Sequence, residues 1–450
     1  MNVAATTTYP RALSRPTSLS RAGYLFLAVF LLVVFEGAVR KWVSSSQSVS
    51  LLLVLVRDLL AFILIIQAWK GGHFKKEKKI AAIMFAWSCL VLLWGLVQLV
   101  GGESSPIVLI IGMRFWLLYT WFAVAAACTM NEADYRAAIM VAAIIMLILA
   151  PLALVQHYSP PGARINMQLD GNEDDVFVVV AGVVRTTGTF SFTTGFANFM
   201  TLVAPIVFGL LGAKKRTTFQ YLLALAVFLA FGIGAVMSGS RTAVISSGAM
   251  FGAYLVGRLL FSKMRNKPAA AVAVVVALAF TALLAYFFQD AIDVTQTRFE
   301  QASAAEDFGG RVFTVLFGES IAYNLMTWLG YGIGFGSNLA TFFRTGGAFF
   351  ALAESEGGRI VLEGGLVGVV FLALKAIALG LGIAKSVRIS ARTNSPFPLL
   401  VWLTTAIALL TWSSIGQLTA NGLLGVMLTF ALLLFRYPRL EIFPPRTSRQ

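Results

Sequence analysis

The sequence predicts an all-α protein, a polytopic bundle of transmembrane helices with about 12 spans and a long external loop between spans 9 and 10. One reason is composition: 58% of the 450 residues are hydrophobic and 12% are charged, whereas soluble domains carry roughly 25% charged residues. A second reason is that apolar runs near the roughly 20 residues needed to cross a bilayer recur along the whole chain. A transmembrane β-barrel would instead show segments of about ten alternating residues, and the sequence shows none.

The apolar runs divide the chain into spans, tails and connections. The predicted spans are 23–40, 50–69, 80–100, 105–127, 136–156, 196–213, 219–237, 242–261, 269–288, 359–384, 397–416 and 421–436. They form one transmembrane domain, 23–436, between an N-terminal tail, 1–22, and a C-terminal tail, 437–450. An even number of spans puts both tails on the same side. Two connections, 157–195 and 289–358, are too long to be turns, and long loops often carry function.

The basic residues fix the orientation of these spans. A formal net charge of +15 would suggest nucleic acid as the partner of a soluble protein. Here most basic residues stand in short loops between apolar runs, so they follow the positive-inside rule and no nucleic-acid partner is expected. With the N-terminus in the cytoplasm, the dense clusters at 70–79, 214–216, 263–267 and 385–392 all lie inside. Both tails are therefore predicted to be cytoplasmic, and both long connections external.

A set of arginines breaks this rule, because each is predicted to lie at or just below the external surface. The set comprises Arg40, Arg57, Arg114, Arg185, Arg241, Arg311 and Arg359. A charge within the membrane costs a few kcal/mol, and arginine binds planar oxyanions such as phosphate through two parallel hydrogen bonds. The set therefore predicts an external basic pocket for a lipid-linked phosphate or diphosphate. For each arginine two alternatives remain: ion pairing, as of Arg57 with Glu36 or Asp58, and contact with phospholipid headgroups.

Carboxylates stand near this predicted pocket, at the end of the second long connection. Glu354 and Glu356 precede the tenth span, and Glu363 follows on roughly the same helical face. A carboxylate beside a basic pocket can accept a proton from a sugar hydroxyl, so Glu354 and Glu356 are candidate general bases. The alternative is a salt bridge to Arg359 or Arg311.

Other motifs point to a loop rather than to a cofactor. The glycine run at 330–336 does not follow a strand, so we interpret it as a flexible or close-packed loop with backbone amides near an anion. With only two histidines and no external D-x-D run, the chain shows no metal-ligand cluster, and we expect neither a metal nor a cofactor.

Short motifs carry a resemblance to a known family. The segments SGSRTA (238–243) and LEGGLVG (362–368), with a long penultimate external loop that ends in a glycine-rich segment, resemble the O-antigen ligase and Wzy-type polymerase superfamily. Other segments resemble more specifically the exopolysaccharide-polymerase-like branch of this superfamily. They are FEGAVRKW (35–42), VRD (56–58), GMRF (112–115), RTTGTF (185–190) and GQLTAN (416–421). The resemblance covers residues 24–436.

The resemblance implies a metal-independent glycosyltransferase in the bacterial inner membrane. Such a protein transfers a glycan from an undecaprenyl-diphosphate carrier to an acceptor hydroxyl on the external face. By the motif match, Arg241 would bind the diphosphate with help from Arg311. The implied partners are the lipid-linked oligosaccharide, membrane lipids, and the flippase and chain-length regulator of the same pathway.

One departure from the family concerns the base. Ligases of the family carry a His–Asn pair nine residues before the glutamate that corresponds to Glu363, whereas this chain has Glu354 and Ser355 there. Either a glutamate, Glu354 or Glu356, replaces the base, or activation of the leaving group by arginine suffices. The departure favours a polymerase of lipid-linked repeats over a ligase that transfers the glycan to another acceptor.

A third alternative is a flippase or exporter of lipid-linked glycan without chemistry of its own. Intramembrane cations of a transporter should line a path across the bilayer. In this sequence they are predicted to lie near one face, with Lys375 alone in the opposite half, which favours an enzyme.

Overall fold

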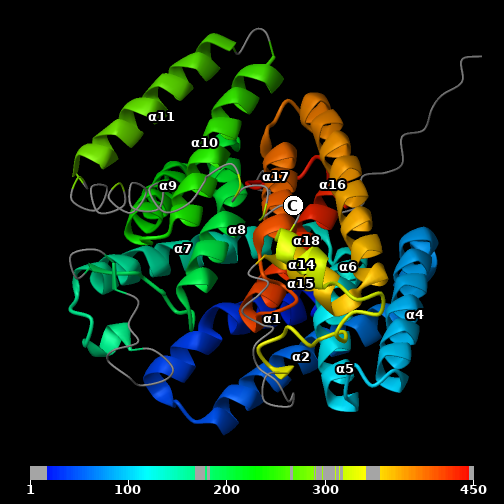
Figure 1. The fold of residues 1–450 in the computed structure, drawn as a ribbon. Coiled ribbons are helices and arrows are strands. Elements are labelled where there is room, and N and C mark those ends of the chain that lie inside the picture. Colours follow the sequence, from blue (N-terminus) through cyan, green and yellow to red (C-terminus); the bar gives the residue numbers. More distant parts are fainter. Residues whose placement is uncertain are drawn as a thin grey trace, which may run out of the picture.

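The computed structural model describes residues 18–167, 178–179, 183–263, 267–287, 318–340 and 355–444, together with isolated positions between them. The predicted all-α class is confirmed: within the described residues, strand is limited to a two-residue antiparallel pair, β1 (Val178–Val179) and β2 (Val183–Val184). Figure 1 shows the rest as a bundle of helices that cross one another.

The helices follow the apolar runs of the sequence closely. The first half contains α1 (Arg21–Ala38) with the π-helical turn η1 (Val39–Val43), α2 (Gln47–Lys70), α3 (His73–Lys76), α4 (Lys78–Val100), α5 (Pro106–Met113), the π-helical turn η2 (Arg114–Leu118), α6 (Tyr119–Thr129), α7 (Glu132–Tyr158) and the 3₁₀ turn η3 (Arg164–Asn166). The second half contains α8 (Thr193–Gly212), α9 (Thr218–Met237), α10 (Arg241–Phe261), α11 (Lys267–Phe287), α14 (Ser320–Leu325), α15 (Glu356–Gly364), α16 (Leu366–Thr393), α17 (Phe397–Thr411) and α18 (Leu418–Arg436).

Ten helical segments of the described residues are long and apolar enough to cross a membrane. They are α1 with η1, α2, α4, α5 to α6 through η2, α7, α8, α9, α10, α16 and α18. The two other predicted spans are also helical, as α11 and α17, but they are not among the ten. With 15 residues, α17 is about 22 Å long, which is shorter than the roughly 30 Å hydrocarbon core. A polytopic membrane protein is therefore confirmed, and the count of twelve stays a prediction.

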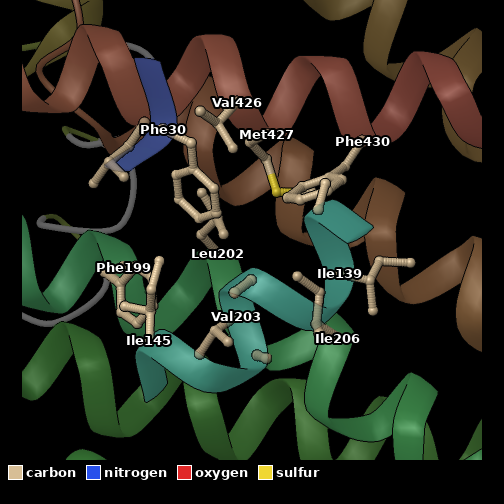
Figure 2. Close-up of a cluster of buried hydrophobic side chains, with 14 of the residues drawn as sticks. Phe30, Ile139, Ile145, Phe199, Leu202, Val203, Ile206, Val426, Met427 and Phe430 are labelled. Atoms are coloured by element: carbon tan, nitrogen blue, oxygen red, sulfur yellow. The ribbon is translucent and has the colours of Figure 1, made fainter. Parts of the chain in front are cut away.

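The helices divide into central and peripheral ones. In the apolar stretch of α8, 83% of the residues are buried inside the bundle, and in that of α18, 72% are buried. The corresponding share for α4, which faces outward, is 17%. Figure 2 shows the core that joins the central helices, where Phe30 of α1, Phe199 and Leu202 of α8, and Met427 and Phe430 of α18 lie together. In Figure 1, α4 lies at one margin of the view and α11 at the other.

The predicted start of the tenth span is wrong. Residues 356–364 form a separate buried helix, α15, and the span α16 begins only at Leu366. The chain breaks at Gly365, which has φ 51°, and a side chain there would meet the carbonyl of Trp328. Arg359 and Glu363 therefore belong to a helix inside the protein.

Lys375 lies in the first half of α16. It lies nine residues, or about 13 Å, from the start of the 28-residue α16, which is about 42 Å long. Lys375 therefore lies in the half of α16 that is nearer to α15, and its depth in the membrane stays a prediction.

A buried ion network joins α1, α2 and η2. The Arg57 side chain is fully buried and donates to Glu36 at 2.6 Å. Arg114 donates to Asp58 through two nitrogens, Nε at 2.7 Å and Nη2 at 3.0 Å, and Tyr119 also donates to Asp58. The sequence left ion pairing open as an alternative for Arg57, and the structure shows it paired with Glu36. Arg114 is paired as well, with Asp58. Two guanidinium groups and two carboxylates compensate one another inside the bundle.

Replacing one partner of this network should destabilise the fold. Arg57→Met leaves Glu36 as an uncompensated buried carboxylate, so we expect a loss of roughly 3–5 kcal/mol in stability. The measurement is thermal unfolding of the purified protein in detergent. The double variant Glu36→Gln with Arg57→Met should recover most of the loss, because no charge is then left unpaired. A single variant as stable as the parent protein would contradict a structural role for the pair.

Candidate functional site

The larger of two adjoining pockets, called here the amphiphilic pocket, has a volume of about 480 Å³, within the range of ligand sites. Leu51 and Val54 of α2 form part of its apolar wall, and Arg40 supplies its charge. Its described lining is Arg40, Ser45, Gln47, Ser50, Leu51, Val54, Ser191, Phe192, Thr194, Gly195, Asn338, Leu339, Gln417, Leu418 and Thr419. The helix ends that meet here, from α1, α2, α8 and α18, are all ends for which the sequence predicts the external face.

The smaller pocket, called here the polar pocket, has a volume of about 170 Å³. Its described lining is Arg185, Thr193, Thr194, Ala197, Asn198, Ser240, Thr242, Thr411, Trp412, Ser413 and Gln417. Arg185 is the charged residue of this set, beside six hydroxyl side chains and two amides. Such a lining suits a strongly hydrated anion or a sugar, because it can replace the hydrogen bonds that either group makes to water.

The two pockets meet at Thr194 and Gln417, which line both. Thr194 Oγ1 lies 3.4 Å from Gln417 Oε1, so a weak hydrogen bond joins α8 to the start of α18. These two side chains, called here the junction, are all that the two linings share.

The segment 185–191 connects both pockets and is fixed by buried hydrogen bonds. Lys41 donates to Thr187 Oγ1 and to the Gly188 carbonyl, both at 2.8 Å. Gln156 of α7 accepts from the Gly188 amide at 2.8 Å. The segment therefore places Arg185 in the polar pocket and Ser191 in the amphiphilic pocket. Sequence reasoning did not single out Lys41 or Gln156 for this role.

The polar pocket has a positive electrostatic character. Burial lowers the pKa of the Arg185 guanidinium below its usual range, and the positive charge of Arg241 lowers it further. Arg185 Nε is buried and has no hydrogen-bond partner among the described residues. Helix α8 begins at Thr193 without a side-chain cap, and its first amides add partial positive charge. Two guanidinium groups and an uncapped helix N-terminus are an arrangement that binds anions.

Arg40 brings a third guanidinium to the site. It lies in the π-helical turn η1, where the wider turn redirects the side chains at the end of α1. Its Nε donates to Ser50 at 3.0 Å, and its Nη1 lies 3.5 Å from Ser191 Oγ. These two hydroxyl contacts hold the Arg40 guanidinium at the edge of the amphiphilic pocket.

Glu356, a predicted base, is 2% exposed and lines neither pocket. Its carboxylate accepts from Ser414 Oγ and from the Ile415 amide, and it lies 3.8 Å from Lys375 Nζ. A salt bridge to Arg359 or Arg311 was the alternative expectation, whereas the structure shows Lys375 as the partner of Glu356. The other predicted base, Glu354, lies outside the described residues, as does Arg311.

Glu363 organises the glycine run. Its carboxylate accepts from the amides of Gly334 at 2.9 Å and Gly336 at 2.7 Å, and from Trp116 Nε1 at 2.9 Å. Gly330, Gly332 and Gly334 all have positive φ, which explains the need for glycine. The interpretation as a close-packed loop with amides near an anion is confirmed, and the anion is the protein's own carboxylate.

The glycine run supports the amphiphilic pocket. It is followed by Asn338 and Leu339, which line this pocket, and the backbone amide of Asn338 donates to the Gly416 carbonyl at 2.9 Å. Arg359 is 8% exposed and its guanidinium packs against Gly416, where no side chain would fit. Arg359 therefore lies behind the pocket wall rather than in the pocket lining.

The predicted arginines thus occupy different places. Arg40 and Arg185 line the pockets, and Arg241 lies beside Arg185. Arg57 and Arg114 belong to the buried ion network. Sequence reasoning missed Thr194 and Gln417, and the GQLTAN motif was the signal that pointed toward the second of them.

Comparison with known proteins adds no family assignment: no family model matches the chain, and no curated protein matches its sequence. Among the described residues, no group of three or more His, Cys, Asp or Glu side chains could hold a metal ion. Function is therefore inferred from the pockets and the sequence motifs together.

The stability of the glycine run should depend on pH through Glu363. Burial raises the pKa of Glu363 to about 7, against the opposing effect of its hydrogen bonds from Trp116, Gly334 and Gly336. The folded protein then binds a proton here more tightly than the unfolded chain does. Its contribution to stability is complete below the unfolded pKa of about 4.3 and is lost as the pH rises through about 7.

The measurement is the thermal unfolding temperature of the parent and of Glu363→Gln across this pH range. The parent should lose more stability than the variant between acidic and neutral pH. Glu77→Gln, which removes an exposed carboxylate, is the matched control. Parallel curves for the parent and Glu363→Gln would show that Glu363 does not titrate in this range.

Proposed function

We propose that the protein polymerises undecaprenyl-diphosphate-linked oligosaccharide repeats into an exopolysaccharide or O-antigen. It would act at the external face of the bacterial inner membrane, with both termini in the cytoplasm. The observation that carries the proposal is the polar pocket, where Arg185 beside Arg241 meets an uncapped helix N-terminus, next to a pocket that is amphiphilic. This combination suits a ligand with an anionic centre and an apolar chain.

The polar pocket supplies what a diphosphate leaving group needs. In glycosyl transfer the acceptor oxygen bonds to the anomeric carbon, and the bond from that carbon to the diphosphate oxygen breaks. The electron pair stays on the diphosphate, so negative charge grows there. Preorganised guanidinium groups and helix amides stabilise this charge in the transition state. Arg185 and Arg241 take this role in the proposal, with Arg311 as predicted from the motifs.

The proton of the acceptor hydroxyl goes to a carboxylate. Glu356 has both oxygens occupied by hydrogen bonds and lies beside Lys375. This engagement favours Glu354 as the base.

The amphiphilic pocket supports a lipid substrate. Leu51 lines it and is 45% exposed, and its neighbours Leu52 and Leu55 are exposed as well. In a membrane such a surface faces lipid tails, so an apolar chain can pass from the bilayer into the pocket. Arg40 lies at its polar side. The prenyl chain of the carrier would lie along α2, with its diphosphate toward Arg40.

The position of the cations favours an enzyme over a flippase or exporter. Lys375, the cation predicted in the opposite half of the membrane, lies in the half of α16 nearer to α15 and is paired with Glu356. Arg57 and Arg114 are compensated by carboxylates. A ligase that transfers the glycan to another acceptor is the second candidate, and the absence of the family's His–Asn pair favours the polymerase.

Removing the cations of the polar pocket tests the proposal. Arg185→Ala and Arg241→Ala should each weaken the binding of inorganic diphosphate to the purified protein by roughly 10–100-fold, since a charged hydrogen bond is lost. Cells that carry either variant should accumulate single lipid-linked repeats facing outward and make little polymer. Arg388→Ala, at an exposed position of α16, is the control.

Two outcomes would contradict the proposal. Full-length polymer from both variants would mean that the polar pocket is not the catalytic site. Repeats trapped on the cytoplasmic side would instead indicate a flippase.

A further inference from the structure

The junction of the two pockets has donors on both of its sides. Thr194 belongs to the first turn of α8, and Gln417 immediately precedes α18. Neither helix has a side-chain cap, so the N-terminal amides of both add partial positive charge here, although the Gly195 amide of α8 donates to the Phe192 carbonyl. Leu418 and Thr419, the first residues of α18, line the amphiphilic pocket. Two helix N-termini of about 20 residues therefore converge where the pockets meet.

Guanidinium groups lie on opposite sides of this junction. Arg40 lines the amphiphilic pocket, and Arg185 with the neighbouring Arg241 belongs to the polar pocket. No carboxylate is present in the described lining of either pocket. An anion with two charged centres that lies beside Thr194 and Gln417 faces a pocket with a guanidinium group on each side, whereas an anion with one centre occupies one pocket only.

Gln417 has a side chain that is available for such a ligand. Its Oε1 accepts the weak hydrogen bond from Thr194, and its Nε2 donates to no described residue. It is half-buried between the pockets and does not cap its own helix. A glutamine Nε2 offers two N–H donors, which suit the oxygens of a phosphate group.

The position of Gln417 is held from behind by α15. Glu356 accepts from Ser414 and Ile415, and Arg359 packs against Gly416. The backbone amide of Gln417 donates to the Ser413 carbonyl at 2.9 Å. The turn 413–417 is thus fixed at consecutive positions, and Ser414, Ile415 and Gly416 are all buried. A side chain at the end of such a turn is preorganised, so little ordering is required when it binds.

We propose that the diphosphate lies across this junction, with one phosphate toward Arg40 and the other toward Arg185 and Arg241. Gln417 then contacts the diphosphate near its bridging oxygen and is the residue that distinguishes a diphosphate from a monophosphate. This assignment rests on the proposed function, since it divides the same site between the two phosphates of the carrier. The phosphate on the Arg40 side carries the prenyl chain, and the phosphate on the Arg185 side carries the glycan.

The experiment compares two probes on the purified full-length protein in detergent, farnesyl diphosphate and farnesyl monophosphate. The parent protein should bind farnesyl diphosphate at least tenfold more tightly than farnesyl monophosphate. Gln417→Ala should reduce this preference roughly tenfold by weakening the diphosphate alone, since one hydrogen bond to a charged group is lost. Unchanged monophosphate binding also shows that the variant is folded. Gln417→Glu should weaken diphosphate binding more than Gln417→Ala does, because it places a negatively charged carboxylate beside the phosphates.

The control is Gln67→Ala, which removes a glutamine at the end of α2 that lies away from the pocket and should leave the preference unchanged. An unchanged preference in Gln417→Ala would overturn the assignment of the junction. If Arg185→Ala and Arg241→Ala still weaken diphosphate binding in that case, the proposed function stands without the junction assignment. If the parent binds neither probe more tightly than these arginine variants do, both the junction assignment and the proposed function are wrong.

Discussion

The compensation of buried charge is the constraint on which the rest of this structure depends. A helical bundle in lipid has no water to solvate an ion, so each buried charge needs a partner within the protein. Arg57 with Glu36, Arg114 with Asp58 and Lys375 with Glu356 meet this need. The described linings of the two pockets differ in kind, because they contain arginine and no carboxylate. The contrast separates cations that are paired with carboxylates inside the bundle from the arginines that line the pockets.

The short helix α15 links these two groups of residues. Glu356, Arg359 and Glu363 are all buried on it. Glu356 and Arg359 contact the turn at 414–416, and Glu363 holds the amides of the glycine run. Both segments continue into pocket walls. Glu356, a predicted base, and Arg359, a predicted member of the basic pocket, therefore lie behind the pocket walls.

The fold class and the helices could be predicted because hydrophobicity is a local property of each run. The break at Gly365 could not, because it arises from a close approach of the chain to Trp328. The partners of Glu363 were equally hidden: Trp116 is 247 residues away in sequence, and the glycine amides carry no side-chain signal. Sequence reasoning singled out Arg40, Arg185 and Arg241 because a positive charge beside long apolar runs is unusual on the predicted external side. It missed Thr194 and Gln417 because neutral polar residues at helix ends are common, and only the fold brings these two together.

The short helix α17 has a consequence for the membrane around the site. Its first residue, Phe397, shares a small pocket with Lys214 and Arg216 of the α8–α9 loop, so it starts level with the basic end of the bundle. A helix of 15 residues that starts there ends about 8 Å short of the far side of a 30 Å hydrocarbon layer. The turn that follows, with Ser413 and Gln417, therefore lies at a depth that acyl chains occupy elsewhere. Such a mismatch is accommodated by local thinning of the bilayer. A lipid headgroup can then descend to the pockets while its chain remains among the surrounding lipids.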